Sequence, residues 1–345
     1  MRRGLFATAL VAILATACGG SAGTPAANGS AAAAPQNTAT ATPVEHHAVR
    51  FAFSAATPQV SKVPSILALE ALKQEGHDVT ILYLQSSEDP VQAVVRGDAN
   101  FGSASASTVF AAIAQGIPVK AIMVANTPDY VMVAPASVTS PSQLGGLKVG
   151  IHAAVSSTAL YTNVMLEKFP GVKPNILVVP GSANRVQALA AGQLDGSVVQ
   201  LSDLPALEKL APGKFHAIFD VAKERPDLMD AVIFTRAELL RSDPNLVQQY
   251  IVAQLKANRN AYADQKGLAA AIAKYVPNTT ADLGAQFAKF YTDSGIWPKD
   301  GGMNGANVSA TLSALTSSKL IAKAPTAAEC CDRSALDAAL KTIGN

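Results

Sequence analysis

The stretch from residue 147 to residue 200 constrains the fold most, because it alternates between two kinds of hydrophobic pattern. Three short apolar runs predict strands, at 148–151, 176–179 and 196–200. Between them, Ser156 and Ser182 are placed to N-cap helices, and Gly192 suits the end of the second helix. Strands that alternate with helices of this length form parallel βαβ units. The sequence therefore predicts an α/β fold.

Polar residues follow the predicted strands of this stretch. Ligands of open α/β sheets bind beyond the carboxyl ends of the strands, near helix N-termini. The predicted strand ends carry hydroxyl, amide and basic side chains, and no carboxylate: His152, Ser156, Ser157, Ser182, Asn184, Arg185, Gln200 and Ser202. We expect these residues to line one half of a binding site.

A second segment of the chain repeats this pattern. In residues 93–102 and again in 189–197, a predicted helix ends at glycine and a short turn leads through Asn100 or Asp195 into a strand. Two lobes built alike account for the repeat, although many α/β units end helices in glycine. Asn100 and Asp195 are interpreted as caps of turn backbone.

The order of the predicted elements suggests an inserted lobe. Residues 135–143 are rich in Pro and Ser and are interpreted as a connector, and a strand at 230–236 would carry the chain back. We therefore predict a discontinuous lobe 1, residues 48–135 plus 234–345, with a helical C-terminal part. Lobe 2 would comprise residues 136–233.

The N-terminus has the features of an export signal. Arg2 and Arg3 precede an apolar run at 4–17 that is too short to span a membrane, and small residues precede Cys18. Residues 1–17 resemble a bacterial lipoprotein signal peptide, which implies lipidation of Cys18; an ordinary secretory signal is the alternative. Residues 18–47, rich in Ala, Ser, Thr, Gly and Pro, are predicted to be a disordered tether.

The charge balance argues against some partners. Cleavage would remove two of 27 basic residues, which leaves 25 against 25 acidic ones. A formally neutral chain gains nothing from attraction to nucleic acid or to an anionic membrane surface. Membrane association is therefore expected through lipid alone.

Five segments together carry a resemblance to a known family. They are residues 95–102, 114–120, 144–150, 188–195 and 332–340. In order and spacing they resemble the periplasmic substrate-binding proteins of ABC importers. The greatest similarity is to the family that binds nitrate, aliphatic sulfonates, taurine or thiamine-precursor pyrimidines.

This resemblance implies a two-lobed type II periplasmic-binding-protein clamp, α/β in class. Each lobe would be a mixed or parallel sheet flanked by helices, and two strands would form the hinge. A small-molecule ligand would close the clamp, and the closed, monomeric, lipid-anchored protein would dock on an ABC permease outside the cytoplasm. The resemblance implies no catalysis and no cofactor.

Two helix N-termini, at 105–107 and 156–158, are expected to face each other across the cleft. Their free N–H groups suit an anionic ligand, sulfonate-like first and pyrimidine-like second. Arg185 would add a charge-assisted bond. The full set of predicted ligand contacts is Ser54, Thr57, Ser103, Ser105, Ser107, Thr127, His152, Ser156, Ser157, Thr158, Ser182, Arg185, Gln200 and Ser202. The alternatives are capping alone for the serines and a solvated helix face for Arg185. Tyr130 and Trp297 could stack on a ligand, but a packing role is expected for both.

The sequence argues against an enzyme and against a metal site. It has no nucleophile–base set, and its His and Cys residues lack metal-ligand spacing. Cys330 and Cys331 do not reproduce the cysteine-rich motif of the pyrimidine-synthesising relatives. A vicinal disulfide, two free thiols and a link to another chain all stay open for this pair. A pyrimidine-synthase-like enzyme and a ligand-sensing domain remain the alternative functions.

Overall fold

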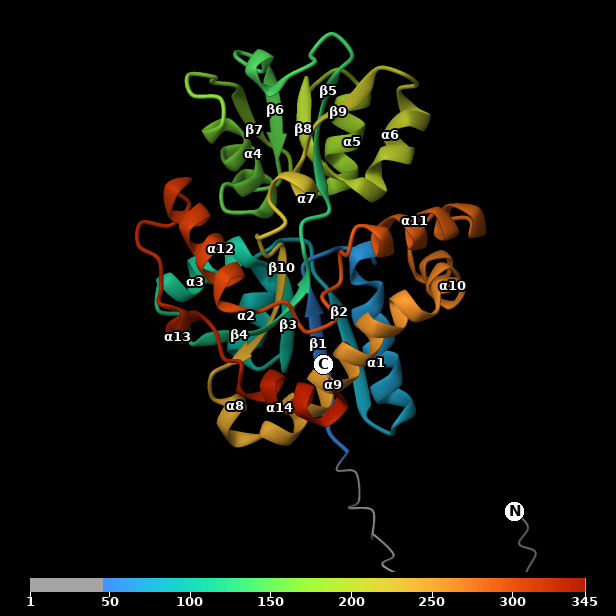
Figure 1. Cartoon of the computed structure of the whole chain (residues 1–345), viewed down its shortest axis with the longest axis vertical. Helices are drawn as coiled ribbons and strands as arrows, with labels where there is room; N and C mark the ends of the chain where they lie inside the picture. The colour runs from blue at the N-terminus through green and yellow to red at the C-terminus, as the bar shows by residue number, and fades with distance from the viewer. Residues whose placement is uncertain (1–45, 345) are drawn as a thin grey trace, which may run out of the picture. The chain divides into compact units, whose positions relative to one another are not determined.

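Two five-stranded sheets form the framework of residues 46–344, the part of the chain that the computed structural model describes (Figure 1). In the first sheet, whose order is β2-β1-β3-β10-β4, β10 runs antiparallel to β3 and β4. Its strands are β1 (Ala48–Phe53), β2 (Asp78–Tyr83), β3 (Phe101–Ser105), β4 (Val119–Asn126) and β10 (Ala231–Arg236).

The second sheet has the order β7-β6-β8-β5-β9. Here β6 is parallel to β7 and β8, whereas β5 is antiparallel to β8 and β9. Its strands are β5 (Tyr130–Pro135), β6 (Lys148–Ile151), β7 (Asn175–Val178), β8 (Gly196–Gln200) and β9 (Phe215–Asp220). Both sheets are thus mixed, which confirms the predicted α/β class with helix-flanked mixed sheets.

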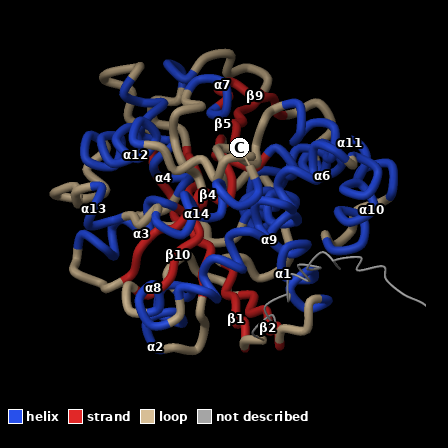
Figure 2. The backbone as a smooth tube through the Cα atoms, turned by 60° about the horizontal axis from the view of Figure 1, so that its bottom comes forward, coloured by secondary structure: helices blue, strands red, loops and turns tan. Residues whose placement is uncertain are grey.

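Four helices flank the second sheet: α4 (Ser157–Glu167), α5 (Ser182–Ala190), α6 (Leu204–Leu210) and α7 (Val221–Glu224). The other helices surround the first sheet, and Figures 1 and 2 show α10 and α11 side by side beyond α9. They are α1 (Val63–Gln74), α2 (Asp89–Arg96), α3 (Ala106–Ala114), α8 (Leu239–Ser242), α9 (Pro244–Ala263), α10 (Gln265–Tyr275), α11 (Ala281–Asp293), α12 (Gly305–Ser317), α13 (Ala327–Cys330) and α14 (Ser334–Ile343). Short 3-10 turns are η1 (Val60–Lys62), η2 (Pro141–Gln143) and η3 (Leu201–Asp203).

The core of the first sheet depends on aromatic packing and on one glycine. The ring of Tyr250 from α9 stacks on Phe101 with 4.5 Å between centroids. At Gly102, an added Cβ would lie 2.4 Å from Cζ of the buried Phe234. Glycine at this position therefore lets β10 and its aromatic side chain pack directly on β3.

The chain crosses between the sheets at residues 126–130 and 220–231, not near residues 135 and 233. The predicted boundaries, 48–135 plus 234–345 against 136–233, are wrong in this respect, because β5 lies entirely in the second sheet. The Pro/Ser-rich segment misled the prediction. It is a loop within the second sheet, where Ser140 and Gln143 form a capping box on η2.

The end of the predicted tether packs on the first sheet. The backbone N–H of His47 donates to Nδ1 of His77 at 3.1 Å, and the His46 ring lies edge-on to His77. Residues 46 and 47 therefore belong to the folded part. The predicted signal peptide, Cys18 and the rest of the tether lie outside the described residues. Between residues 46 and 344, no helix is both long and apolar enough to cross a membrane.

Candidate functional site

A buried polar network lies where the chain crosses between the two sheets. Asn126 ends β4 at the first crossing, and Asp230 precedes β10 at the second. Nδ2 of Asn126 donates to Oδ2 of Asp230 at 2.7 Å. The two crossing segments are therefore bonded directly to each other.

Asp230 also joins helices that flank different sheets. The hydroxyl of Tyr161, on α4, donates to Oδ1 of Asp230 at 2.9 Å. The backbone N–H of Ala106, the first residue of α3, donates to the Asp230 carbonyl at 2.7 Å. One aspartate thus holds α3, α4 and the second crossing together.

Lys62 brings a buried positive charge to this network. Its side chain is 6% exposed, and Nζ donates to Oδ1 of Asn126 at 3.2 Å. Burial lowers the pKa of Lys62, and the negative charges of Asp230 and Asp129 oppose that shift. Among the described residues, the ammonium group has no hydrogen bond to either acid, so the two carboxylates balance its charge through space.

Asp129, just before β5, is the most enclosed acid of the network. Its Oδ2 accepts from the Tyr291 hydroxyl at 2.8 Å and from Nε2 of Gln200 at 3.2 Å. Its Oδ1 has no partner among residues 46–344. Burial raises the pKa of Asp129 to about 7, and the charge of Asp230 adds to this shift while the Tyr291 bond and Lys62 oppose it.

A third acid, Asp203, organises the helix that follows β7. Its Oδ2 accepts from the Ser182 hydroxyl, which begins α5, and from the Gln200 N–H at 3.0 Å. Arg185, also on α5, is 2% exposed, and Nη1 donates to the carbonyls of Val179 and Gly181 at 3.3 and 3.1 Å. Its Nε has no partner within the described part of the chain. Burial lowers the pKa of Arg185, against the opposing influence of Tyr130 and Asp203.

The two predicted helix N-termini do meet. The Thr108 hydroxyl, on α3, donates to the carbonyl of Val155, just before α4, at 3.0 Å. Ser105 caps α3 by accepting from the Thr108 N–H, and Ser156 caps α4 by accepting from the Ala159 N–H, both at 3.3 Å. Ser105 and Ser156 therefore cap their helices, which was the alternative to ligand contact, at a place where two helix ends face each other. Ser182 does not cap α5, whose N-cap position is Gly181.

The remaining predicted residues divide into buried and peripheral groups. Nδ1 of His152 accepts from the Gly181 N–H at 3.0 Å, and burial, with Arg185 second, lowers the pKa of His152. Ser103 is fully buried, and its Oγ has no partner among the described residues. The others are Ser107, Ser157 and Thr158, which are buried; Ser54, Thr127 and Ser202, which are half-buried; and Thr57, which is exposed.

The aromatic candidates are structural. Nε1 of Trp297 donates to the Ser61 carbonyl at 2.9 Å, and the ring stacks on Tyr291. Tyr130 lies against Tyr161 with 5.4 Å between ring centroids. At 1% exposure, Trp297 has the packing role expected of it.

The expectation that the strand ends carry no carboxylate is wrong. Asp203 contacts Ser182 and Gln200, both of them predicted site residues. Asp230 falls within the strand predicted at 230–236, and Asp129 begins an apolar run; in the structure each directly precedes a strand at a crossing. An acid directly before a buried apolar strand is the sequence signal that could have identified them. Burying a charge is costly unless it is paired, so such an acid indicates a polar partner nearby.

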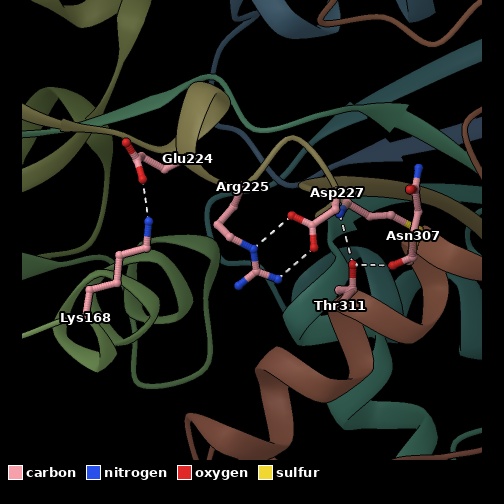
Figure 3. A network of polar contacts seen from close by, with 7 residues as sticks. Lys168, Glu224, Arg225, Asp227, Asn307 and Thr311 are labelled. Carbon is pink, nitrogen blue, oxygen red and sulfur yellow. Dashed lines mark hydrogen bonds and ion pairs between the residues drawn. The ribbon is translucent and has the colours of Figure 1, made fainter.

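Residues near the second crossing brace it (Figure 3). Arg225 binds Asp227 with two bonds, Nε to Oδ1 at 2.8 Å and Nη2 to Oδ2 at 2.9 Å. The Thr311 hydroxyl of α12 accepts from the Met229 N–H at 3.0 Å and donates to the Asn307 carbonyl at 2.8 Å. These bonds hold residues 225–229 in place, and so position Asp230, which follows them, in the network.

The charges of the buried network nearly balance. The cations are Lys62 and Arg185, and the acids are Asp129, Asp203 and Asp230, so the local charge is close to neutral once one acid is protonated. Across residues 46–344, no cluster of three or more His, Cys, Asp or Glu side chains is arranged to hold a metal ion.

One protein-family model matches the sequence. The model of the NMT1/THI5-like family matches residues 72–267, more than half of the chain. No curated protein matches the sequence.

Several solved structures share the fold. A ligand-binding component of an ABC-type import system from Staphylococcus aureus, with zinc bound, is 14% identical, with a TM-score of 0.73 over 86% of this chain and 99% of that one. The alkanesulfonate-binding protein SsuA of Xanthomonas axonopodis, bound to MOPS, is 17% identical, with a TM-score of 0.64 over 82% and 95%. The nitrate-binding protein NrtA of Synechocystis is 13% identical, with a TM-score of 0.56 over 66% of each chain.

Proposed function

The chain belongs to the NMT1/THI5-like family, and from that premise we propose that it is the solute-binding component of an ABC importer. It would capture a small organic ligand between its two sheets by closure of the clamp. The observation that carries the proposal is the network at the crossings, where side chains from both halves meet around Asp129 and Asp230. A ligand favours the closed state only through contacts made in that state, and this junction is where both halves are within reach.

The proposed ligand-binding residues are those at the strand ends and helix N-termini. Support comes from Thr108 and Val155, which join the two helix starts, and from the buried Arg185 and Ser103, each with an unpaired polar atom among the described residues. Unpaired N–H groups at helix N-termini favour an anionic group, so a sulfonate-like ligand comes first. A pyrimidine-like ligand is the alternative.

The partners follow from the same proposal. The protein would be a monomer without catalytic activity, exported by residues 1–17, lipid-anchored outside the cytoplasm through Cys18, and docked on a membrane permease when closed. A sensor that presents its ligand to a receptor is the alternative. Replacing Cys18 with Ala should release the protein from membranes, and continued retention in the membrane fraction would contradict the anchor.

A thermal-shift screen tests ligand binding. Sulfonates, nitrate, bicarbonate, pyrimidines and aromatic acids should be tested, because a ligand at 100 times its Kd stabilises the folded state by roughly 2.7 kcal/mol. If no compound raises the Tm, the proposed ligand class is wrong.

A pair of cap variants then locates the site. Ser156→Ala and Thr280→Ala each remove the N-cap of a helix, α4 at the crossing and α11 away from it. Both variants should lose comparable stability, about 1 kcal/mol. Only Ser156→Ala should reduce the rise in Tm that the ligand causes. An equal reduction in both variants would show that the ligand does not bind at the N-terminus of α4.

A further inference from the structure

We propose that the ligand held at this junction presents an amino group to Oδ1 of Asp129. The inference rests on the proposed solute-binding function and specifies one chemical feature of the solute. It applies equally to a protonated amine and to the amino group of a neutral ring, since both offer N–H donors to a carboxylate.

The first argument is that Oδ1 of Asp129 lacks a hydrogen-bond donor among the described residues. Asp129 is fully buried, and both donors that reach it, the Tyr291 hydroxyl and Nε2 of Gln200, bond to Oδ2. Oδ1 is left without a partner in residues 46–344. Buried polar atoms without a partner are rare and destabilising, so an acceptor kept in this state calls for a donor from outside the chain.

The second argument is the position of Asp129. It lies at the first crossing, while Gln200 ends β8 of the second sheet and Tyr291 comes from α11 beside the first. A ligand bonded to Oδ1 would therefore reach groups of both halves at once. That is the requirement for a contact that favours clamp closure.

The third argument is charge. The groups around Asp129 are Asp230 and Asp203, which are acidic, Lys62, and the neutral Tyr291 and Gln200. Nζ of Lys62 donates to Oδ1 of Asn126, not to Asp129. An anionic group placed at Oδ1 would meet like charge in a low-dielectric setting, whereas an N–H donor would be attracted. Any anionic part of the ligand would instead bind at the N-termini of α3 and α4.

The protonation of Asp129 makes the inference sharper. Because its pKa is raised to about 7, the carboxyl is mostly neutral at pH 6 and mostly ionised at pH 8. An amino group bonds the ionised form, so binding should strengthen by about tenfold from pH 6 to pH 8. A solute without a donor has no reason to show this rise.

Titration calorimetry with two matched pairs of probes tests the proposal. Taurine is compared with ethanesulfonate, and 4-aminopyrimidine with pyrimidine, at pH 6 and pH 8. We expect the amino member of at least one pair to bind at least tenfold more tightly at pH 8 than its partner. Asp129→Asn should abolish that preference, and Asp195→Asn, which changes a turn acid bonded to the Lys148 N–H, should keep it.

Each other outcome overturns the proposal. If the two members of each pair bind wild type equally, or if Asp129→Asn keeps the preference, the protein binds solutes but Asp129 does not recognise an amino group. A buried water bonded to Oδ1 would give this result. If neither amino probe binds while the wider screen returns a ligand without an amino group, the amino inference fails and solute binding stands. If the whole screen is negative, both fail. Should Asp129→Asn not fold, the pH dependence of the wild-type preference decides alone.

Discussion

The buried carboxyl of Asp129 should make the stability of the protein fall as the pH rises from 5 to 7. Its folded-state pKa is raised from 3.8 to about 7. A group whose pKa is raised on folding binds protons more tightly in the folded state. Its contribution is therefore complete below the unfolded pKa and is lost as the pH rises through the folded one.

The size of the effect follows from the two pKa values. Between pH 5 and pH 7 the contribution of Asp129 should fall by about 2 kcal/mol, and between pH 7 and pH 8 by only about 0.3 kcal/mol. Asp129→Asn removes this titration while keeping the shape of the side chain. The free energy of unfolding of the variant, minus that of wild type, should therefore rise steeply to pH 7 and then level off.

Urea unfolding at pH 5, 6, 7 and 8 measures this difference. His77 and His152, whose pKa values are lowered by burial, act in the opposite direction but are present in both proteins, so they cancel. A difference that stays constant with pH would show that Asp129 does not titrate in this range. A difference that falls with pH would show that Asp129 is paired in the folded state more strongly than its contacts indicate.

Two further substitutions test the packing around the network. Tyr161→Phe removes a hydroxyl that donates to a buried carboxylate, so urea unfolding should show a loss of about 1.5–3 kcal/mol, against about 1 kcal/mol for Tyr250→Phe, whose hydroxyl meets a neutral amide; equal losses would refute the charged bond. Gly102→Ala should cost about 1–3 kcal/mol, because its Cβ would lie 2.4 Å from Phe234, whereas Gly145→Ala, which meets nothing within 4 Å, should stay within about 0.5 kcal/mol of wild type. A small effect of Gly102→Ala would mean that Phe234 can move aside.

Features set by neighbouring residues were predictable from sequence. Gly97 ends α2 in the left-handed conformation with φ of 83°, which glycine adopts without strain. Ser156 and Asp243 begin helices as side-chain caps, each accepting a backbone N–H three residues ahead. Such signals act over one helical turn, and the alternation of strands and helices follows from them.

Features set by distant residues were not predictable in the same way. The run from Tyr130 to Pro135 is apolar and reads as a buried strand in either sheet. Its place is decided by pairing with β8 and β9, whose residues lie far along the chain. A proline-rich segment after it resembled a linker, and only the tertiary structure distinguishes a linker from a capped surface loop.

The misplaced crossing and the missed acids have one cause. When β5 is assigned to the first lobe, Asp129 lies inside that lobe as an ordinary strand residue. When β5 begins the second sheet, the same residue stands at the junction, with Tyr291 162 positions away and Gln200 71 positions away as its donors. An acid buried between two halves of a fold stays charged only if both halves, or a ligand, supply its partners. The sheet order therefore explains why the acids gather at the crossing, far from one another in the sequence.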